Sequence, residues 1–408
     1  MKNSNNQKGG ERMLKILIVG GTFSNTKNAD GTYGKPSGLI KKIANAIFQN
    51  NTYMIQNNMQ QEINIILFNG GKYSELQTIL ENNVPTANIV FWFANVDNAL
   101  PKVRNVKEIN PKTMLVTSKR NDDNKYSIAE LINRALTAKA NLLFEFNKKE
   151  NKVFNIRILD PLGCLWYDGT NIDMAIINAL SRLNFLLQIT RQGTVNAPIE
   201  TDMIAKMYFD KQFKKGASEK EFIKIIRKHA DTFHELVPHT PTDRMLGNCS
   251  CEPYRCTKGF PSRNIGGTIL VSKRNVNKSN ISYSDFVPVH LGKDGTLYYY
   301  GNNKPSVDSP IQVRLYAALP NILRMIHSHC YIKDAPFTER AIPCGGIEEV
   351  DEILKLIDST SNRYQSCYKI NLLGHGSIIM THTVEELNDV EYIPRPIPEI
   401  INQKGKNT

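Results

Sequence analysis

The sequence LKILIVGG at residues 14–21 begins the first regular part of the chain. Its apolar run predicts a buried β-strand, and the two glycines predict a tight turn after it. Similar apolar runs alternate with stretches of helical periodicity, which is the pattern of a parallel sheet with helices on both faces. The expected strands are 14–19, 63–68, 88–93 and 114–117, and the expected helices lie near 36–49, 73–82 and 127–138. Extended segments at 141–146 and 153–159 and a helix near 172–187 complete this region.

The second half of the chain has a different order of expected elements. A helix at 219–236 is followed by a loop rich in glycine, cysteine and proline at 238–268. This order predicts a second domain of α/β or α+β type. Its remaining expected elements are strands at 268–272, 286–290 and 296–300, a helix near 309–319, a strand near 322–329, a helix near 346–357, and strands near 368–373 and 376–381.

The domain limits follow from length and local composition. A chain of 408 residues is longer than one hydrophobic core usually supports. We expect flexible polar tails at 1–12 and 402–408, a Rossmann-like α/β domain at 13–200 and a second domain at 201–401. The segment 192–198 has the composition of a linker between them.

The composition is that of a globular protein, and we expect a cytoplasmic one. No stretch approaches the ~20 continuous apolar residues of a membrane helix, and the polar start of the chain has no signal-peptide core. The seven cysteines suit a compartment in which thiols stay reduced. Cys249, Cys251 and Cys256 lack a matching second pair of ligands, so we expect free thiols in a loop rather than a metal knuckle.

The net charge of +12 favours an anionic partner. The basic residues are spread along the chain and form no recognisable nucleic-acid motif, so the pattern favours a solvated surface with a few anion-binding side chains. The charge leaves open the phosphates of a small substrate, and we expect neither a membrane nor a nucleic acid as partner.

The N-terminal domain contains a candidate anion site. Glycines after a first strand and a helix N-terminus both allow a phosphate to approach backbone N–H groups. The dinucleotide and Walker A fingerprints are absent, so a simple tight turn and a nucleotide or sugar-phosphate site both remain open. Ser-Lys-Arg-Asn follows an expected strand twice, at 118–121 and 272–275, by coincidence or as two anion-binding sites. The candidate residues in the N-terminal domain are Gly20, Gly21, Thr22, Ser37, Lys119 and Arg120.

Three histidines form the candidate metal centre of the second half. His327 and His329 end one apolar run, and His375 ends another. Successive side chains of a strand alternate between its faces, so His327 and His329 are expected to point the same way. Three imidazoles with an open fourth position are typical of a catalytic zinc ion.

The motifs around these histidines follow one another in a fixed order, at 247–250, 272–278, 281–287, 303–310, 327–329 and 374–376. This succession resembles the class II aldolase/adducin family over roughly residues 215–395. The resemblance implies an α/β/α domain, and members of the family are typically tetramers, so it also implies a homo-oligomer.

The resemblance also implies roles for individual residues. His327, His329 and His375 match the three zinc-binding histidines, and Asp308 matches the acidic residue that acts as general acid/base beside the metal. In the family, Zn²⁺ holds two oxygens of a ketose phosphate and stabilises the enediolate. The positions that match phosphate-binding residues are Asn248 and Ser306, with Lys273 and Arg274 as further candidates.

The sequence departs from the family at several of these positions. A turn that commonly contains Thr-Pro-Ser-Gly is replaced here by the bulky, cationic Ser-Lys-Arg-Asn at 272–275. Val307 takes the place of the second serine of Pro-Ser-Ser, and the segment between His329 and Pro343 is short. These changes favour a substrate different from the usual small sugar phosphates, or a site that has lost its chemistry.

The leading hypothesis is a zinc-dependent, aldolase-like lyase that acts on a phosphorylated sugar or a related carbonyl compound. A dehydratase or an epimerase of the same family is the nearest competing hypothesis, because the three reactions share metal-bound carbonyl chemistry. Two more distant hypotheses are a non-catalytic, adducin-like binding protein and a nucleotide-processing enzyme whose main activity lies in the N-terminal domain.

Overall fold

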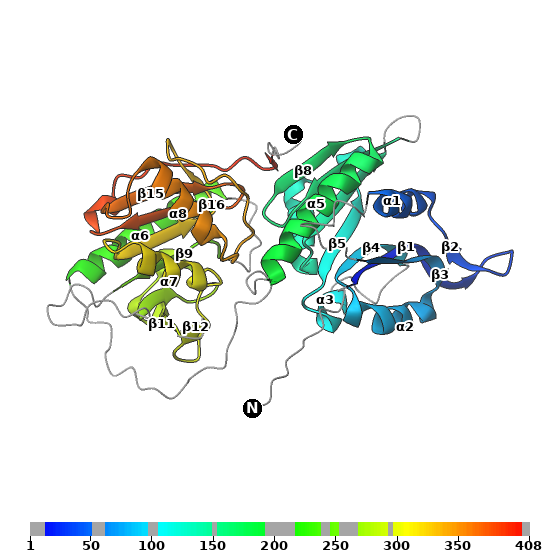
Figure 1. The fold of residues 1–408 in the computed structure, drawn as a ribbon, viewed down its shortest axis with the longest axis horizontal. Helices are drawn as coiled ribbons and strands as arrows, with labels where there is room; N and C mark the ends of the chain where they lie inside the picture. The colour runs from blue at the N-terminus through cyan, green and yellow to red at the C-terminus, as the bar shows by residue number, and fades with distance from the viewer. Residues whose placement is uncertain are drawn as a thin grey trace, which may run out of the picture. The chain divides into compact units, whose positions relative to one another are not determined.

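A computed structural model describes residues 13–50, 62–96, 105–148, 153–191, 217–237, 245–252, 268–292 and 297–401 (Figure 1). The chain forms two compact units, which are Met1–Gln188 with Ile400–Thr408 (unit 1) and Ile189–Glu399 (unit 2). The predicted boundary at residue 200 and the predicted linker and tails lie outside the described residues.

Unit 1 is built on a nine-stranded sheet. Five strands run parallel in the order β3-β1-β4-β5-β6, and β7 and β8 continue the sheet antiparallel. This parallel order is that of a doubly wound α/β fold. The strands are β1 (Leu14–Lys27), β2 (Tyr33–Lys35), β3 (Ile63–Lys72), β4 (Ile89–Val96), β5 (Met114–Arg120), β6 (Leu142–Lys148), β7 (Phe154–Leu159), β8 (Cys164–Gly169) and β18 (Glu399–Ile400).

Helices cover both faces of the parallel strands because the strand residues are apolar on both faces. Leu17 and Val19 of β1 pack in one core with the buried residues of the second and fourth helices, whereas Gly20 faces Ile40 of the first helix. The helices of unit 1 are α1 (Gly38–Gln49), α2 (Tyr73–Asn83), α3 (Asn105–Ile109), α4 (Ile128–Ala138) and α5 (Ile172–Arg191).

By length and composition, α5 is the one described helix that could cross a membrane. In the structure 56% of its apolar window is buried within the protein, and such burial is typical of a core helix. This is weak evidence for a membrane span.

Unit 2 has a seven-stranded antiparallel sheet in the order β12-β11-β10-β9-β13-β16-β15 and a small two-stranded sheet of β14 and β17. Its strands are β9 (Asn248–Cys251), β10 (Ile269–Ser272), β11 (Phe286–Leu291), β12 (Leu297–Tyr299), β13 (Arg324–Ser328), β14 (Tyr331–Ile332), β15 (Cys367–Leu372), β16 (Gly376–Thr381) and β17 (Tyr392–Ile393). Its helices are α6 (Ala217–Leu236), α7 (Ser309–Ala318) and α8 (Glu349–Thr360).

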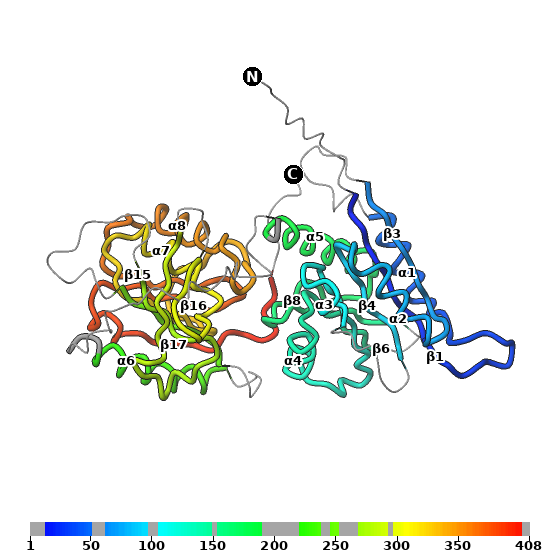
Figure 2. The backbone as a smooth tube through the Cα atoms, turned by 90° about the horizontal axis from the view of Figure 1, so that it is seen from below, coloured from blue at the N-terminus to red at the C-terminus, as the bar shows by residue number. Residues whose placement is uncertain are grey.

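The large sheet of unit 2 is the middle layer of an α/β/α sandwich. Figure 2 shows α7 and α8 on one side of β15 and β16 and α6 on the other. Alternate residues of each strand enter the two cores. Met325 of β13 packs with α7 and α8, whereas its neighbour Ile326 packs with α6.

The predicted fold class is confirmed. The structure is mixed α/β, with a parallel sheet in unit 1 and an α/β/α arrangement in unit 2. The predicted helices and strands coincide with observed elements, although β1 and β3 extend further than expected.

One structural prediction was wrong. Residues 248–251 of the predicted loop form β9, so Cys249 and Cys251 are buried free thiols in a strand rather than in a loop. Cys256 lies outside the described residues. The run Asn-Cys-Ser-Cys is short and polar, and only pairing with both neighbouring strands makes it regular.

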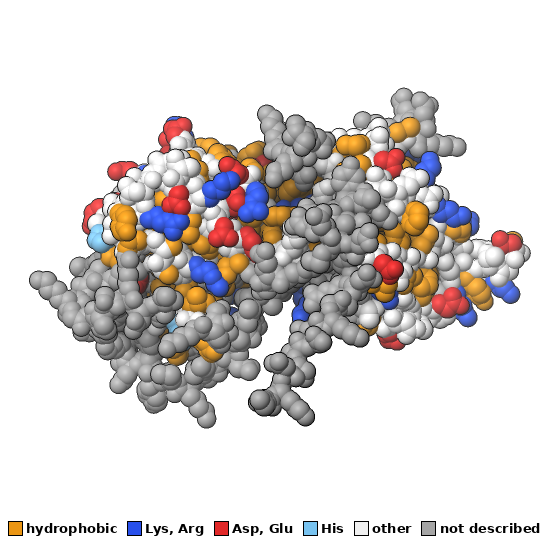
Figure 3. All heavy atoms as spheres, viewed as in Figure 1, with side chains coloured by type: hydrophobic (Ala, Val, Ile, Leu, Met, Phe, Trp, Pro, Cys, Tyr) orange, Lys and Arg blue, Asp and Glu red, His pale blue; other side chains and the backbone are white. Residues whose placement is uncertain are grey.

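Charges of both signs are interspersed on the face of the described residues in view (Figure 3). The excess of basic residues therefore does not gather into a single positive patch on that face.

Glycines let the backbone segments around the middle of β1 approach one another closely. Gly34 has a φ of +60°, and a Cβ atom there would lie 1.9 Å from the carbonyl oxygen of Thr22. A Cβ atom on Gly21 would meet the backbone nitrogen of Gly70 at 2.6 Å. Gly34 and Gly21, the latter a residue of the candidate anion site, are thus required for packing of the chain against itself.

We expect Gly34→Ala to destabilise unit 1 by about 1–3 kcal/mol, because alanine is strained at this φ and its methyl group would collide with Thr22. Urea unfolding followed by tryptophan fluorescence measures this effect, since the two tryptophans, Trp92 and Trp166, both lie in unit 1. Gly38→Ala is the matched control, because nothing lies within 4 Å of a Cβ atom there. Equal unfolding midpoints for the two variants would contradict this assignment.

Candidate metal centre

The central strand of unit 2 places the first histidine of the site. On β13, His327 is paired with Asn248 of β9 on one side and with Ile378 of β16 on the other. His327 follows Met325 by two residues and so lies on the face of the sheet that α7 and α8 cover. His329 comes one residue after the end of β13, and His375 immediately precedes β16.

The three predicted histidines lie together. The ring centroids of His327 and His375 are 4.7 Å apart, and His329 lies 5.2 Å from His327 and 5.1 Å from His375. Each histidine offers a ring nitrogen within 4.8 Å of the other two. The residues are 3%, 8% and 0% exposed for His327, His329 and His375, so the cluster is buried.

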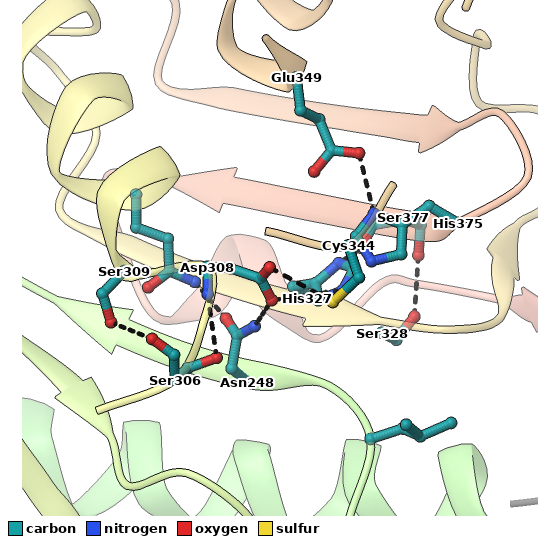
Figure 4. Close-up of polar contacts among 12 residues, drawn as sticks. Asn248, Ser306, Asp308, Ser309, His327, Ser328, Cys344, Glu349, His375 and Ser377 are labelled. Atoms are coloured by element: carbon teal, nitrogen blue, oxygen red, sulfur yellow. Dashed lines mark hydrogen bonds and ion pairs between the residues drawn. The ribbon is translucent and has the colours of Figure 1, made fainter. Parts of the chain in front are cut away.

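Hydrogen bonds orient two of these rings. His327 Nδ1 lies 2.9 Å from the carbonyl oxygen of Ser377, and His375 Nδ1 lies 2.9 Å from Glu349 Oε1 (Figure 4). A carbonyl or carboxylate oxygen can only accept, so each Nδ1 carries the proton. The Nε2 atoms of both rings are buried and make no hydrogen bond with the described residues. Such buried, unpartnered nitrogens fit a metal ion, because ligating histidines usually donate their other nitrogen in this way.

The electrostatics of the cluster also fit a cation. Burial, together with the neighbouring His375, lowers the pKa of His327 to about 4, and burial lowers the pKa of His329 well below its ordinary value. Burial opposes protonation of His375 as well, but Glu349 and Cys344 outweigh it and raise the pKa of His375 well above its ordinary value. The cluster thus offers two neutral imidazoles, and a metal ion can replace the proton on the third.

Asp308 adjoins the histidines from the start of α7. Its Oδ2 accepts a hydrogen bond of 2.6 Å from Asn248 Nδ2 and lies 3.9 Å from His327 Nε2. Gln312 in turn donates to Asn248 Oδ1. This buried chain of side chains fixes the direction of the Asp308 carboxylate.

Two groups of the site were not predicted, and both come from one segment. Cys344 Sγ lies 3.7 Å from Asp308 Oδ1, and Asp308, Cys344 and His375 offer ligand atoms within 4.8 Å of one another. Glu349 lies in the first turn of α8, and its carboxylate holds His375. The spacing of Cys344 and Glu349 in the sequence carries no signal of their approach to His375.

Three of the four candidate phosphate-binding residues lie in two paired segments, and the fourth, Asn248, lies in β9. Lys273 forms a β-bridge with Pro305, and Arg274 N donates to Lys304 O. The side chain of Lys273 lies 3.2 Å from Asp285, and Arg274 Nε lies 3.4 Å from the carbonyl oxygen of Pro305. Ser306 is buried, and its hydroxyl accepts from Asp308 N at 3.4 Å. Asn248 is bound to Asp308, as described above.

A further buried cation was not predicted. Lys278 donates to the carbonyl oxygens of Met245 and Leu246, and burial lowers its pKa to about 8. The charge of Asp308 acts in the opposite direction. Lys278 therefore adds positive potential on the Asp308 side of the site.

The candidate anion site of unit 1 is divided by the sheet. Strand β4 lies between β1, which carries Gly20, Gly21 and Thr22, and β5, which carries Lys119 and Arg120. The backbone nitrogen of Ser37 donates to Asn69 of β3, on the other side of β1. Lys119 lies 4.1 Å from the centre of the Tyr126 ring, and Arg120 forms an ion pair with Asp122. Asn69 Oδ1 would also lie 2.8 Å from a Cβ atom on Gly21, so Ser37 lies near the glycines, whereas β4 separates Lys119 and Arg120 from them.

Residues 227–333 match the family model of the Class II Aldolase and Adducin N-terminal domain. The matched range contains Asn248, Asp308, His327 and His329, whereas His375 lies beyond it. The predicted resemblance is therefore confirmed for this part of the chain. No curated protein matches the sequence.

Several solved structures show weak similarity. A DNA/pantothenate metabolism flavoprotein from Streptococcus pneumoniae is 13% identical, with a TM-score of 0.30, and the match covers 45% of this chain and 99% of that chain. An L-fuculose 1-phosphate aldolase is 16% identical, with a TM-score of 0.28 and coverage of 42% and 80%. The L-fuculose-1-phosphate aldolase from Thermus thermophilus is 15% identical, with a TM-score of 0.26 and coverage of 41% and 89%. At these TM-scores the similarities establish no shared activity.

We expect Glu349→Gln to lower the affinity for zinc by about 10–100-fold, because the charged partner of His375 Nδ1 is lost. Competition with a chromogenic chelator measures this affinity. Asp351→Asn is the matched control, since Asp351 lies in the same first turn of α8 but is exposed to solvent. An equal loss in both variants would mean that Glu349 acts through the helix and not through His375.

Proposed function

We propose that unit 2 is a zinc-dependent, aldolase-like lyase that acts on a phosphorylated sugar or a related carbonyl compound. The observation that carries the proposal is the pair of buried, unpartnered Nε2 atoms of His327 and His375, beside His329 and the fixed carboxylate of Asp308. Buried polar atoms without partners are costly, so their retention favours a ligand at this point.

Zinc is the metal that this donor set favours. Imidazole nitrogens suit zinc, and three of them leave a fourth position for another ligand. When bound, the metal would supply a Lewis acid that polarises a substrate carbonyl. All three histidines are buried, and exclusion of water from the site would strengthen this polarisation.

Asp308 is the proposed general acid/base. Its carboxylate adjoins His327, and Asn248 and Gln312 hold it in one direction. A carboxylate so placed can take the proton that leaves the substrate and return it to the product. The hydrogen bond from Asn248 holds Asp308 Oδ2, and Oδ1 then faces Cys344. We infer that Asn248 positions the carboxylate of Asp308.

The substrate phosphate is proposed to lie at the paired segments 272–274 and 304–306. The hydroxyl of Ser306 and the cationic side chains of Lys273 and Arg274 are the anion-binding groups there. The ammonium group of Lys273 forms an ion pair with Asp285. An incoming phosphate would compete with the Asp285 carboxylate for this ammonium group. The bulk of these side chains, where the family commonly has glycine, favours a substrate larger than a simple sugar phosphate.

Deuterium exchange into dihydroxyacetone phosphate tests the proposal without knowledge of the natural aldehyde partner. We expect the zinc-loaded protein in D₂O to exchange a carbon-bound proton of this ketone, measured by NMR. Asp308→Asn should lower the exchange rate by about 10²–10⁴-fold, the usual contribution of a general acid/base. His327→Ala should lose both zinc and exchange.

His382→Ala is the matched control for His327→Ala. His382 is exposed, and its Nδ1 contacts the carbonyl oxygen of Asn321, away from the cluster. It should retain zinc and exchange. Bound zinc without turnover of any ketose phosphate would instead favour the non-catalytic binding protein, and loss of water from the substrate without C–C cleavage would favour the dehydratase.

A further inference from the structure

A thiol enters the candidate metal centre from outside the part of the chain that matches the family model. Cys344 lies in a tight turn before α8, in which Gly346 N donates to the carbonyl oxygen of Pro343 at 2.9 Å. Gly345 in this turn has a φ of +79°. Figure 4 shows the sulfur of Cys344 pointing toward Asp308 and the histidines.

The segment 344–349 delivers two groups to the same histidine. Glu349, at its end, holds His375 Nδ1 at 2.9 Å, which directs His375 Nε2 away from α8. Cys344, at its start, offers its sulfur within 4.8 Å of a ring nitrogen of His375. The ring of His375 is therefore placed between an orienting carboxylate and a thiol.

The distances suit a shared ion. Two donor atoms of a tetrahedral zinc site with Zn–N of about 2.0–2.1 Å and Zn–S of about 2.3 Å lie roughly 3.5 Å apart. The Cys344 sulfur lies within 4.8 Å of ligand atoms of His375 and Asp308, whereas His327 and His329 form a second such group with His375. His375 thus belongs to both groups, and an ion shared by all four donors requires the Cys344 side chain to turn toward His327 and His329. The unpartnered Nε2 atoms of His327 and His375 are the independent sign that a ligand is bound at this point.

We propose that Cys344 is the fourth protein donor of the metal centre formed by His327, His329 and His375. This inference rests on the proposed metal site. On binding, the thiol loses its proton to solvent and the thiolate sulfur completes a three-histidine, one-cysteine set. In the absence of substrate the site would then be closed, and a substrate oxygen would have to replace the sulfur or add to it.

Asp308 is the competing candidate for the fourth position. Its Oδ2 already accepts from Asn248, and its Oδ1 accepts from Cys344. Binding of the sulfur to the metal leaves the bond from Asn248 to Asp308 intact and frees Asp308 Oδ1 for the substrate. Binding of Asp308 would instead occupy the group that the proposed function needs as a base.

A thiolate donor also changes which metals the site favours. Three imidazoles alone accept several divalent ions, whereas a soft sulfur donor favours zinc over the hard ions magnesium and manganese. We therefore expect this centre to discriminate against magnesium and manganese more strongly than Cys344→Ser does.

Cobalt substitution of the full-length protein tests the inference. Cobalt(II) bound by a thiolate has an intense near-ultraviolet charge-transfer band, which cobalt bound only by nitrogen and oxygen lacks. The wild-type protein with one cobalt ion per chain should show this band. Cys344→Ser should bind cobalt without the band, and its zinc affinity should fall by about 10-fold or more.

Cys367→Ser is the matched control, because Cys367 is also a partly buried free thiol of unit 2 but lies at the start of β15. It should keep the band. Cys344→Ala, checked by circular dichroism, guards against a folding defect specific to the serine variant.

The outcomes separate this inference from the proposed function. One outcome is that the wild type binds cobalt without the thiolate band and that His327→Ala does not bind cobalt. This outcome would overturn the role of Cys344 but would support the histidine centre. A band retained in Cys344→Ser and Cys344→Ala would also overturn it. Failure of the wild type to bind cobalt or zinc would overturn both proposals.

Discussion

The antiparallel pairing of β13 with β9 and β16 is the constraint on which the site depends. It places Asn248, His327 and Ser377 in neighbouring strands, so the bond from His327 Nδ1 to the Ser377 carbonyl follows from the register of the sheet. Successive side chains of β13 point to opposite faces of the sheet, and this alternation places His327 on the face covered by α7 and α8. A slip of one residue would exchange His327 for Ser328 on the face covered by α7 and α8 and so destroy the cluster.

The rest of the site depends on the carboxylates that α7 and α8 place on this face of the sheet. Asp308 stands at the start of α7, and Glu349 stands in the first turn of α8. Each carboxylate is buried and held by a polar partner, Asn248 for Asp308 and His375 for Glu349, because an isolated buried charge is costly. The carboxylates in turn favour positive charge among the three histidines. A divalent cation would therefore provide a partner for the buried nitrogens that make no hydrogen bond with the described residues.

Much of this arrangement could be predicted from the sequence. The periodicity of apolar residues predicted the α/β class and most helices and strands, and the ordered motifs predicted which three histidines would meet. Strand β9 was missed because Asn-Cys-Ser-Cys has no apolar alternation and becomes a strand only through its two neighbours. Cys344 and Glu349 were missed as partners of His375 because tertiary packing of the segment before α8, and not spacing, brings them there. Lys119 and Arg120 were grouped with Gly20, Gly21 and Thr22 because the sequence did not reveal that β4 separates β1 from β5.

The central claim is that unit 2 holds one metal ion among His327, His329 and His375. Anomalous X-ray diffraction from crystals of the zinc-loaded protein, measured on both sides of the zinc absorption edge, tests it most directly. The account predicts a single anomalous peak per chain, bonded to the Nε2 atoms of His327 and His375 and to a ring nitrogen of His329. Zinc bound elsewhere in unit 2, or water molecules bonded to these nitrogens in zinc-saturated crystals, would contradict it.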